Sequence, residues 1–150
     1  MARIRNKDRK LVVNRWMTPD GTYLQSRHTH DYVEYVDKNG ETYMVDGGSA
    51  YIRTSMNKIP MKCCCLYDDD PISEIRKYLM RGTFNSEGRP VWVPLCEMSD
   101  DHVKNCITYN EERGFKDSPI TECYRREVEY RLKHGIKIEE KTYDDYKVEW

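Results

Sequence analysis

The Asn39-Gly40 pair is the feature that most constrains how this 150-residue chain can fold. Both residues tolerate the positive φ that a two-residue type I′ turn requires, and apolar and polar residues alternate on either side of them. The pattern predicts a β-hairpin in which Lys38 lies opposite Glu41. Both faces of this hairpin are partly apolar, so the sequence does not decide which face meets the core.

The predicted pairing sorts the hairpin residues into two sets. With Lys38 opposite Glu41, the pairs that follow along the strands are Val36 with Tyr43, Tyr35 with Met44, and Val33 with Asp46. One face would carry Asp31, Val33, Tyr35, Met44 and Asp46, and the other would carry His28, His30, Tyr32, Val36, Tyr43 and Val45.

Strand patterns fill the first half of the chain and helix patterns fill the second. Extended segments are predicted at 11–16, 22–24, 61–67 and 91–95, and 50–54 fits either a strand or a helical turn. Three helices are predicted to start at Asp70-Pro71, Ser99 and Ser118-Pro119, and to stop at Gly82, Gly114 and Gly135. The third has an apolar stripe made of Ile120, Cys123, Tyr124, Val128 and Leu132. This order predicts an α+β fold, in which an N-terminal antiparallel hairpin or sheet packs with about three helices from the C-terminal half.

Length and charge limit the classes of protein to consider. We expect residues 1–150 to form a single domain, with a mobile basic arm at 1–10 and an acidic tail at 136–150. The formal net charge of -1 argues against a dedicated, strongly basic nucleic-acid-binding protein. No run approaches the roughly 18 apolar residues of a membrane span, so no membrane association is expected.

Six cysteines bear on the compartment and on metal binding. Residues 1–10 are charged and lack the apolar run of a signal peptide, so we expect a reducing, cytoplasmic location with unpaired thiols. The cysteine spacing contains no C-x-x-C pair, which argues against structural zinc, and no cofactor is predicted. Residues 63–65 are three adjacent cysteines. They favour a buried core strand in which Cys64 faces away from its two neighbours.

The segment His28-Thr29-His30-Asp31 is the sharpest chemical signal. In an extended chain His28 and His30 would point the same way, roughly 6–7 Å apart, and could share a metal or grip one anionic group. Asp31 would point to the opposite face, which leaves a metal site short of a third ligand. The alternatives are a ligand contact without metal and a structural pair of histidines at the mouth of the hairpin.

The segment Asp46-Gly47-Gly48, followed by Arg53, is the second signal. Paired glycines after a strand let backbone amides approach an anion, and Arg53 could add a bidentate contact. The alternative is a tight turn capped by Asp46, with Arg53 paired to a carboxylate. Together with the first signal, this predicts a ligand-binding site at the open end of the hairpin, made of His28, His30, Tyr32, Asp46, Gly47, Gly48, Tyr51 and Arg53.

Twelve tyrosines also stand out in the composition. Tyrosine suits surfaces with one apolar side and one wet side, such as ligand sites and subunit interfaces. We therefore predict a homo-oligomer, and ordinary amphipathic packing is the alternative.

The chain resembles a family of small accessory proteins of tailed bacteriophages. The match runs from about Trp16 to Gly135 and rests mainly on two segments, H-x-H-D-[YF] at 28–32 and VDGG-x-x-Y-x-R at 45–53. The segments VWVPLCEMSDDHVKNCI and YRREVEYRLKHG add to it, whereas the triple cysteine and the acidic tail lie outside it. The resemblance carries over no catalytic residue. It implies a protein that acts in the bacterial cytoplasm after infection.

The sequence therefore favours a binding protein over an enzyme. The expected role is to antagonise a host anti-phage factor, either by binding a host protein or by sequestering a small anionic, nucleotide-like signal. One alternative is a metal-dependent hydrolase that uses His28, His30 and Asp31. Another is a regulator that binds DNA or a polymerase through the basic arm.

Overall fold

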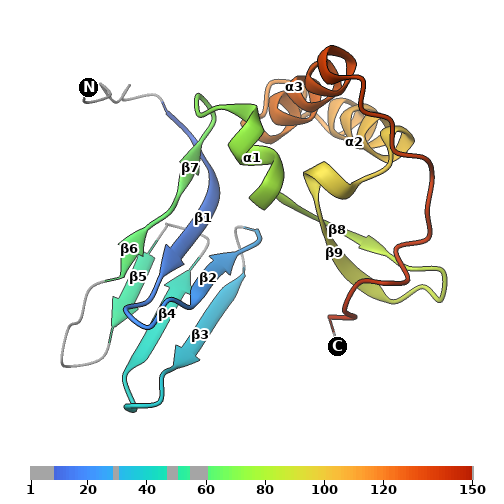
Figure 1. The fold of residues 1–150 in the computed structure, drawn as a ribbon. Coiled ribbons are helices and arrows are strands. Elements are labelled where there is room, and N and C mark those ends of the chain that lie inside the picture. The colour runs from blue at the N-terminus through green and yellow to red at the C-terminus, as the bar shows by residue number, and fades with distance from the viewer. Residues whose placement is uncertain (1–8, 29–30, 47–50, 55–60, 150) are drawn as a thin grey trace. The chain divides into compact units, whose positions relative to one another are not determined.

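The chain forms two compact units, residues 1–67 and 68–150, and each is described by itself. The structure is a computed structural model that describes residues 9–28, 31–46, 51–54 and 61–149, with the backbone alone for 51–54 (Figure 1). Antiparallel strands make up the first unit, and three helices with one hairpin make up the second. The predicted α+β class is confirmed, whereas the single domain over 1–150 stays a prediction.

The first unit contains two small antiparallel sheets. In one sheet β1 lies between β2 and β6 and also pairs with β7, and in the other β4 lies between β3 and β5. The strands are β1 (Leu11–Met17), β2 (Tyr23–Ser26), β3 (Tyr32–Val36), β4 (Thr42–Asp46), β5 (Tyr51–Thr54), β6 (Lys62–Cys63) and β7 (Leu66–Tyr67). A turn at 18–21 joins β1 to β2, with Gly21 at a φ of 87°.

The β3–β4 hairpin forms, but the predicted register is wrong by one residue. Tyr35 pairs with Tyr43, not with Met44. The turn bond runs from the amide of Gly40 to the carbonyl of Asp37 (3.0 Å), and Gly40 alone in the turn has a positive φ, of 81°. This is a three-residue loop closed by a glycine bulge, not a type I′ turn at Asn39-Gly40. The Asp37 carboxylate favours the longer loop because it accepts bonds from the amides of Asn39 (2.9 Å) and Glu41 (3.0 Å).

The shifted register decides which hairpin face is buried. Val33, Tyr35, Tyr43 and Val45 now lie on one face, where they pack with Leu24, Met61 and Trp16. The opposite face carries Tyr32 and Val36, which are 54% and 60% exposed. A one-residue slip moves every side chain of a strand to the other face, so the two predicted sets of residues are wrong.

The cysteine run at 63–65 does not form a core strand, contrary to the prediction. Only Cys63 lies in a strand, at the end of β6, and Cys64 and Cys65 lie in the connection from β6 to β7, two short strands that both pair with β1. Cys63 is exposed, and Cys64 and Cys65 are half-buried. A core strand needs neighbours on both faces, whereas these strands are only two residues long.

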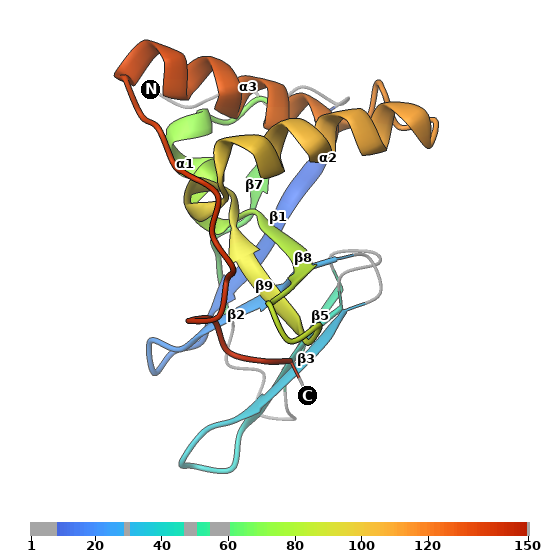
Figure 2. The ribbon, with the colours of Figure 1, turned by 90° about the vertical axis from the view of Figure 1, so that its right-hand side faces the viewer.

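The second unit contains a β-hairpin and two antiparallel helices that lie side by side (Figure 2). The elements are α1 (Ile72–Tyr78), β8 (Met80–Phe84), β9 (Pro90–Pro94), the short helix η1 (Leu95–Glu97), α2 (Asp100–Glu112) and α3 (Pro119–His134). Ser99 caps α2 as predicted, because its hydroxyl accepts a bond from the amide of His102 (3.2 Å). Gly135 ends α3 in the left-handed conformation, also as predicted.

Two expectations for the first helix of this unit are wrong. The N-cap of α1 is Pro71, not Asp70. The helix ends at Tyr78, with Leu79 as its C-cap, and Gly82 lies inside β8 opposite Trp92. A Cβ on Gly82 would lie 3.3 Å from the Trp92 ring, so this glycine gives room to the ring and does not stop the helix.

The C-terminal segment packs back onto its own unit. Val148 forms a β-bridge with Val91, and the amide of Glu149 donates to the carbonyl of Pro90 (2.9 Å). Closer to α3, the carbonyl of Ile138 accepts a bond from the amide of Asp100 (2.9 Å). Among the described residues, no helix is both long enough and apolar enough to cross a membrane.

Candidate functional site

Part of the site predicted at the hairpin end is brought together by the backbone. Tyr32 pairs with Asp46, and Asp46 pairs in turn with Tyr51 of β5, so three predicted residues form one row across the sheet. Arg53 lies two pairs further along, opposite Met44. His30, Gly47 and Gly48, and the side chains of Tyr51 and Arg53, lie outside the described residues.

His28 and Asp31 lie in the connection from β2 to β3, because β3 begins only at Tyr32. The amide of Asp31 donates to the carbonyl of His28 (3.1 Å). His28 therefore does not lie on a strand, contrary to the prediction. The Asp31 carboxylate accepts bonds from both the amide (2.9 Å) and the Nε (3.1 Å) of Arg27. Burial alone would raise the pKa of Asp31, but the hydrogen bonds and charge of Arg27 outweigh it and lower this pKa.

These contacts bear on the metal-site hypothesis. Arg27 competes with a metal for the Asp31 oxygen that it already binds. Within the described ranges, no group of three or more His, Cys, Asp or Glu side chains is arranged to hold a metal ion. The site made of His28, His30 and Asp31 stays a prediction, since His30 is outside those ranges.

In the second unit a buried ionic network ties three helices to the chain before α2. Glu127 of α3 is fully buried, and its carboxylate accepts bonds from Arg76 of α1 (2.8 and 3.0 Å) and from Nε of Arg131 (2.7 Å). Arg131 also donates to Asp100 (2.7 Å) and to the carbonyl of Leu95 (2.9 Å). The Arg76 pKa is raised chiefly by the hydrogen bond to Glu127. The network fixes where α3 lies against the start of α2.

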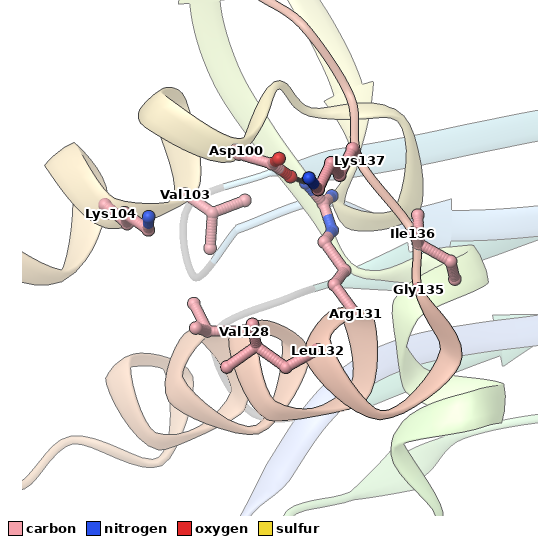
Figure 3. Close-up of a pocket in the computed structure, with 9 residues that line it drawn as sticks. All are labelled: Asp100, Val103, Lys104, Val128, Arg131, Leu132, Gly135, Ile136 and Lys137. Carbon is pink, nitrogen blue, oxygen red and sulfur yellow. Dashed lines mark hydrogen bonds and ion pairs between the residues drawn. The ribbon is translucent and has the colours of Figure 1, made fainter.

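A groove lies beside this network, between the start of α2 and the end of α3. Figure 3 shows Arg131 reaching from α3 to Asp100, with Val128 and Leu132 of α3 near Val103 of α2. The groove has a volume of about 270 Å³ and is mostly apolar. Its lining residues are Asp100, Val103, Lys104, Val128, Arg131, Leu132, Gly135, Ile136 and Lys137.

The groove combines an exposed apolar side chain with a basic rim. Leu132 is 79% exposed although the helical stripe predicted it in the core. Lys104 and Lys137 are both exposed and line the opening. The charge of Arg131 is matched by Glu127 and Asp100, so the two lysines make the groove locally positive. Such a surface suits an acidic partner with an apolar anchor.

The sequence contained a partial signal for this groove. The apolar stripe of α3 runs through Tyr124, Val128 and Leu132, and only its first part is covered, since Tyr124 is buried. The exposure of Leu132 depends on where α2 begins, and that is set by Ser99 and by the pairing of Asp100 with Arg131. Periodicity within one helix contains no information about that pairing.

Three comparisons with known proteins give no match: no protein-family model, no curated protein and no solved structure corresponds to this chain.

Proposed function

We propose that this protein acts by binding another protein, and that the groove between α2 and α3 receives an acidic segment with an apolar anchor side chain. The observation that carries the proposal is Leu132, which lies 79% exposed at the groove beside the buried Val103. Covering a leucine of this kind contributes about 1.5–3 kcal/mol when it is complete. Exposed apolar surface next to a concavity typically marks an interaction site.

The mostly apolar lining of the groove favours an apolar side chain of a partner over a polar small molecule. Its volume of about 270 Å³ is sufficient for one such side chain. A segment of a partner, helical or extended, could place one apolar residue there and lie across both helices.

The two lysines at the groove determine which charge the partner segment should carry. Lys104 and Lys137 would meet carboxylates that flank the anchor, and exposed pairs of this kind mainly increase the association rate and the selectivity. The whole chain carries a net charge of -1, so this positive surface is local.

The resemblance to phage accessory proteins extends the proposal. On that basis the partner would be a host factor in an infected bacterium, and binding would antagonise it. The hydrolase alternative is less favoured because Arg27 already engages the Asp31 carboxylate.

The test uses the full chain and two amphipathic peptides that share an apolar face with leucine anchors. One carries glutamates beside the anchors and the other carries lysines. We expect the glutamate peptide alone to bind and to shift the amide resonances of α2 and α3 around Lys104 and Leu132.

Variant proteins distinguish binding in the groove from nonspecific hydrophobic binding elsewhere on the surface. Leu132→Asp should abolish binding of the glutamate peptide, whereas Phe115→Asp, at a side chain 58% exposed outside the groove, should not affect it. Equal binding of both peptides, no binding of either, or an unchanged affinity of Leu132→Asp would overturn the proposal.

A further inference from the structure

A second concave site in the same unit lies where three segments meet, away from the groove. The end of β8 with its following turn, the first turns of α2, and the C-terminal segment enclose a volume of about 290 Å³. In contrast to the groove, its lining is mainly polar. The residues that matter to the argument are Phe84, Asp101, His102, Asn105, Glu140 and Tyr143.

Two of the lining residues, His102 and Tyr143, are paired with each other. Nδ1 of His102 lies 2.8 Å from the Tyr143 hydroxyl, and the same hydroxyl accepts a bond from the amide of Ser99 (3.0 Å). Tyr143 is the only non-glycine described residue with a positive φ, 57°, a backbone conformation that large side chains rarely adopt. This uncommon conformation accompanies the burial of the tyrosine ring, which is 8% exposed.

The geometry assigns a tautomer to His102. Burial, together with the nearby Arg81, lowers the pKa of His102, so its ring is neutral near neutral pH. Among the described residues the Tyr143 hydroxyl has two partners, the Ser99 amide, which can only donate, and Nδ1 of His102, so Nδ1 is the acceptor for the phenolic proton. Nε2 then carries the imidazole proton. None of the described residues is a hydrogen-bond partner of Nε2, so this N–H is available to a ligand in the pocket that His102 lines.

The other lining groups define what such a ligand must offer. Asp101 and Glu140 accept hydrogen bonds from donors, and because these two carboxylates outnumber the single lysine of the lining, Lys141, they disfavour an anion. The Asn105 amide can donate or accept. Phe84 is 65% exposed at the pocket and presents an apolar ring on which a planar group can stack.

We propose that this pocket binds the base of an amino-bearing nucleoside, a planar heteroaromatic ring with an exocyclic amine and a ring-nitrogen acceptor. His102 Nε2–H would donate to the ring nitrogen, a carboxylate of Asp101 or Glu140 would accept from the amine, and Phe84 would stack on the ring. The volume suits a base or a nucleoside. This site is separate from the protein-binding groove, and it differs from the hairpin end to which sequence reasoning assigned a nucleotide-like ligand.

Adenosine and inosine provide a matched pair of probes, because they differ at the position of the exocyclic amine. With the full chain in calorimetry or ligand-observed NMR, we expect saturable binding of adenosine and at least tenfold weaker binding of inosine. A site that hydrogen-bonds a donor discriminates strongly against an analogue that lacks it.

Phe84→Ala and His102→Gln should each weaken adenosine binding tenfold or more. Phe115→Ala and His134→Gln, at exposed positions away from the pocket, should leave it unchanged. Phe84 is a surface side chain, so its variant tests the site even if His102→Gln unfolds. Leu132→Asp should also bind adenosine normally, which separates this site from the groove. No saturable adenosine binding, equal binding of inosine, or unchanged affinity of Phe84→Ala would overturn the proposal.

Discussion

At the scale of single residues, Glu127 is a charged side chain whose burial depends on its ion-pair partners. Its carboxylate is fully buried, and its partners among the described residues are both charged, Arg76 and Arg131. Removing one member of a buried ion network leaves the other charges without compensation, and this costs more than the network itself contributes.

We therefore expect Glu127→Ala to lower the free energy of unfolding by about 3–5 kcal/mol. Urea denaturation of the full chain, followed by circular dichroism, measures this change. The matched control is Glu129→Ala, an exposed glutamate on the same helix, which should change the free energy by less than about 0.5 kcal/mol. A change of similar size in both variants would contradict the role assigned to Glu127.

The same helix shows what the sequence can predict about a residue. The apolar stripe of α3 correctly placed Cys123 and Tyr124 in the core, because neighbours along a helix share a face. It wrongly placed Leu132 there, and it did not predict that Glu127 and Arg131 are buried. Charged residues are buried only where partners meet them, and Arg76 lies 51 positions away in the sequence.

At the scale of elements, the β3–β4 hairpin shows that the position of a turn can be predicted from the sequence when the type of the turn cannot. The Asn39-Gly40 signal placed the hairpin correctly, but a two-residue turn and a three-residue loop with a bulge use the same letters. The choice depends on the Asp37 side chain, which binds the amides of Asn39 and Glu41. The hairpin of β8 and β9 was half missed, because Gly82 was interpreted as a helix stop.

Two substitutions distinguish the observed loop from the predicted turn. In the observed loop only Gly40 needs a positive φ, and a Cβ there would meet no atom within 4 Å. Gly40→Ala should therefore destabilise the protein by about 1–2 kcal/mol through backbone conformation alone. Asn39→Ala should cost less than about 0.5 kcal/mol, since Asn39 does not have a positive φ.

Thermal unfolding of the two variants beside the wild type measures the difference. A type I′ turn requires a positive φ at both positions, so equal costs at Asn39 and Gly40 would favour the register that the sequence predicted.

At the scale of the whole molecule, the order of strands and helices was sufficient to predict the α+β class. Local patterns indicate the type of each element, and the order of these elements along the chain indicates the fold class. The candidate site was less predictable. Patterns drew attention to the histidines and glycines of the hairpin, whereas the groove arises from residues of α2, α3 and the segment after α3, none of which is distinctive alone. The homo-oligomer suggested by the tyrosine content stays a prediction.

The division into two compact units leads to a prediction about folding. The second unit draws a core from its own residues, including Ile75, Leu79, Val91, Val93, Leu95, Met98, Val103 and Tyr124. Some of its polar contacts are internal as well, since Arg126 donates to the carbonyls of Asp68 and Asp70 (both 2.8 Å) and Glu127 pairs with Arg76. A segment with its own core and internal contacts of this kind has what an independently folding domain requires.

Residues 68–150 expressed alone should therefore fold. We expect a dispersed amide NMR spectrum whose peaks for α2 and α3 overlay those of the full chain, and a single cooperative urea transition. Glu127→Ala in this fragment serves as the internal control, because it should lower the midpoint of that transition. A fragment with a collapsed spectrum and no transition would instead support the single domain over 1–150, since the core of residues 68–150 would then depend on the rest of the chain.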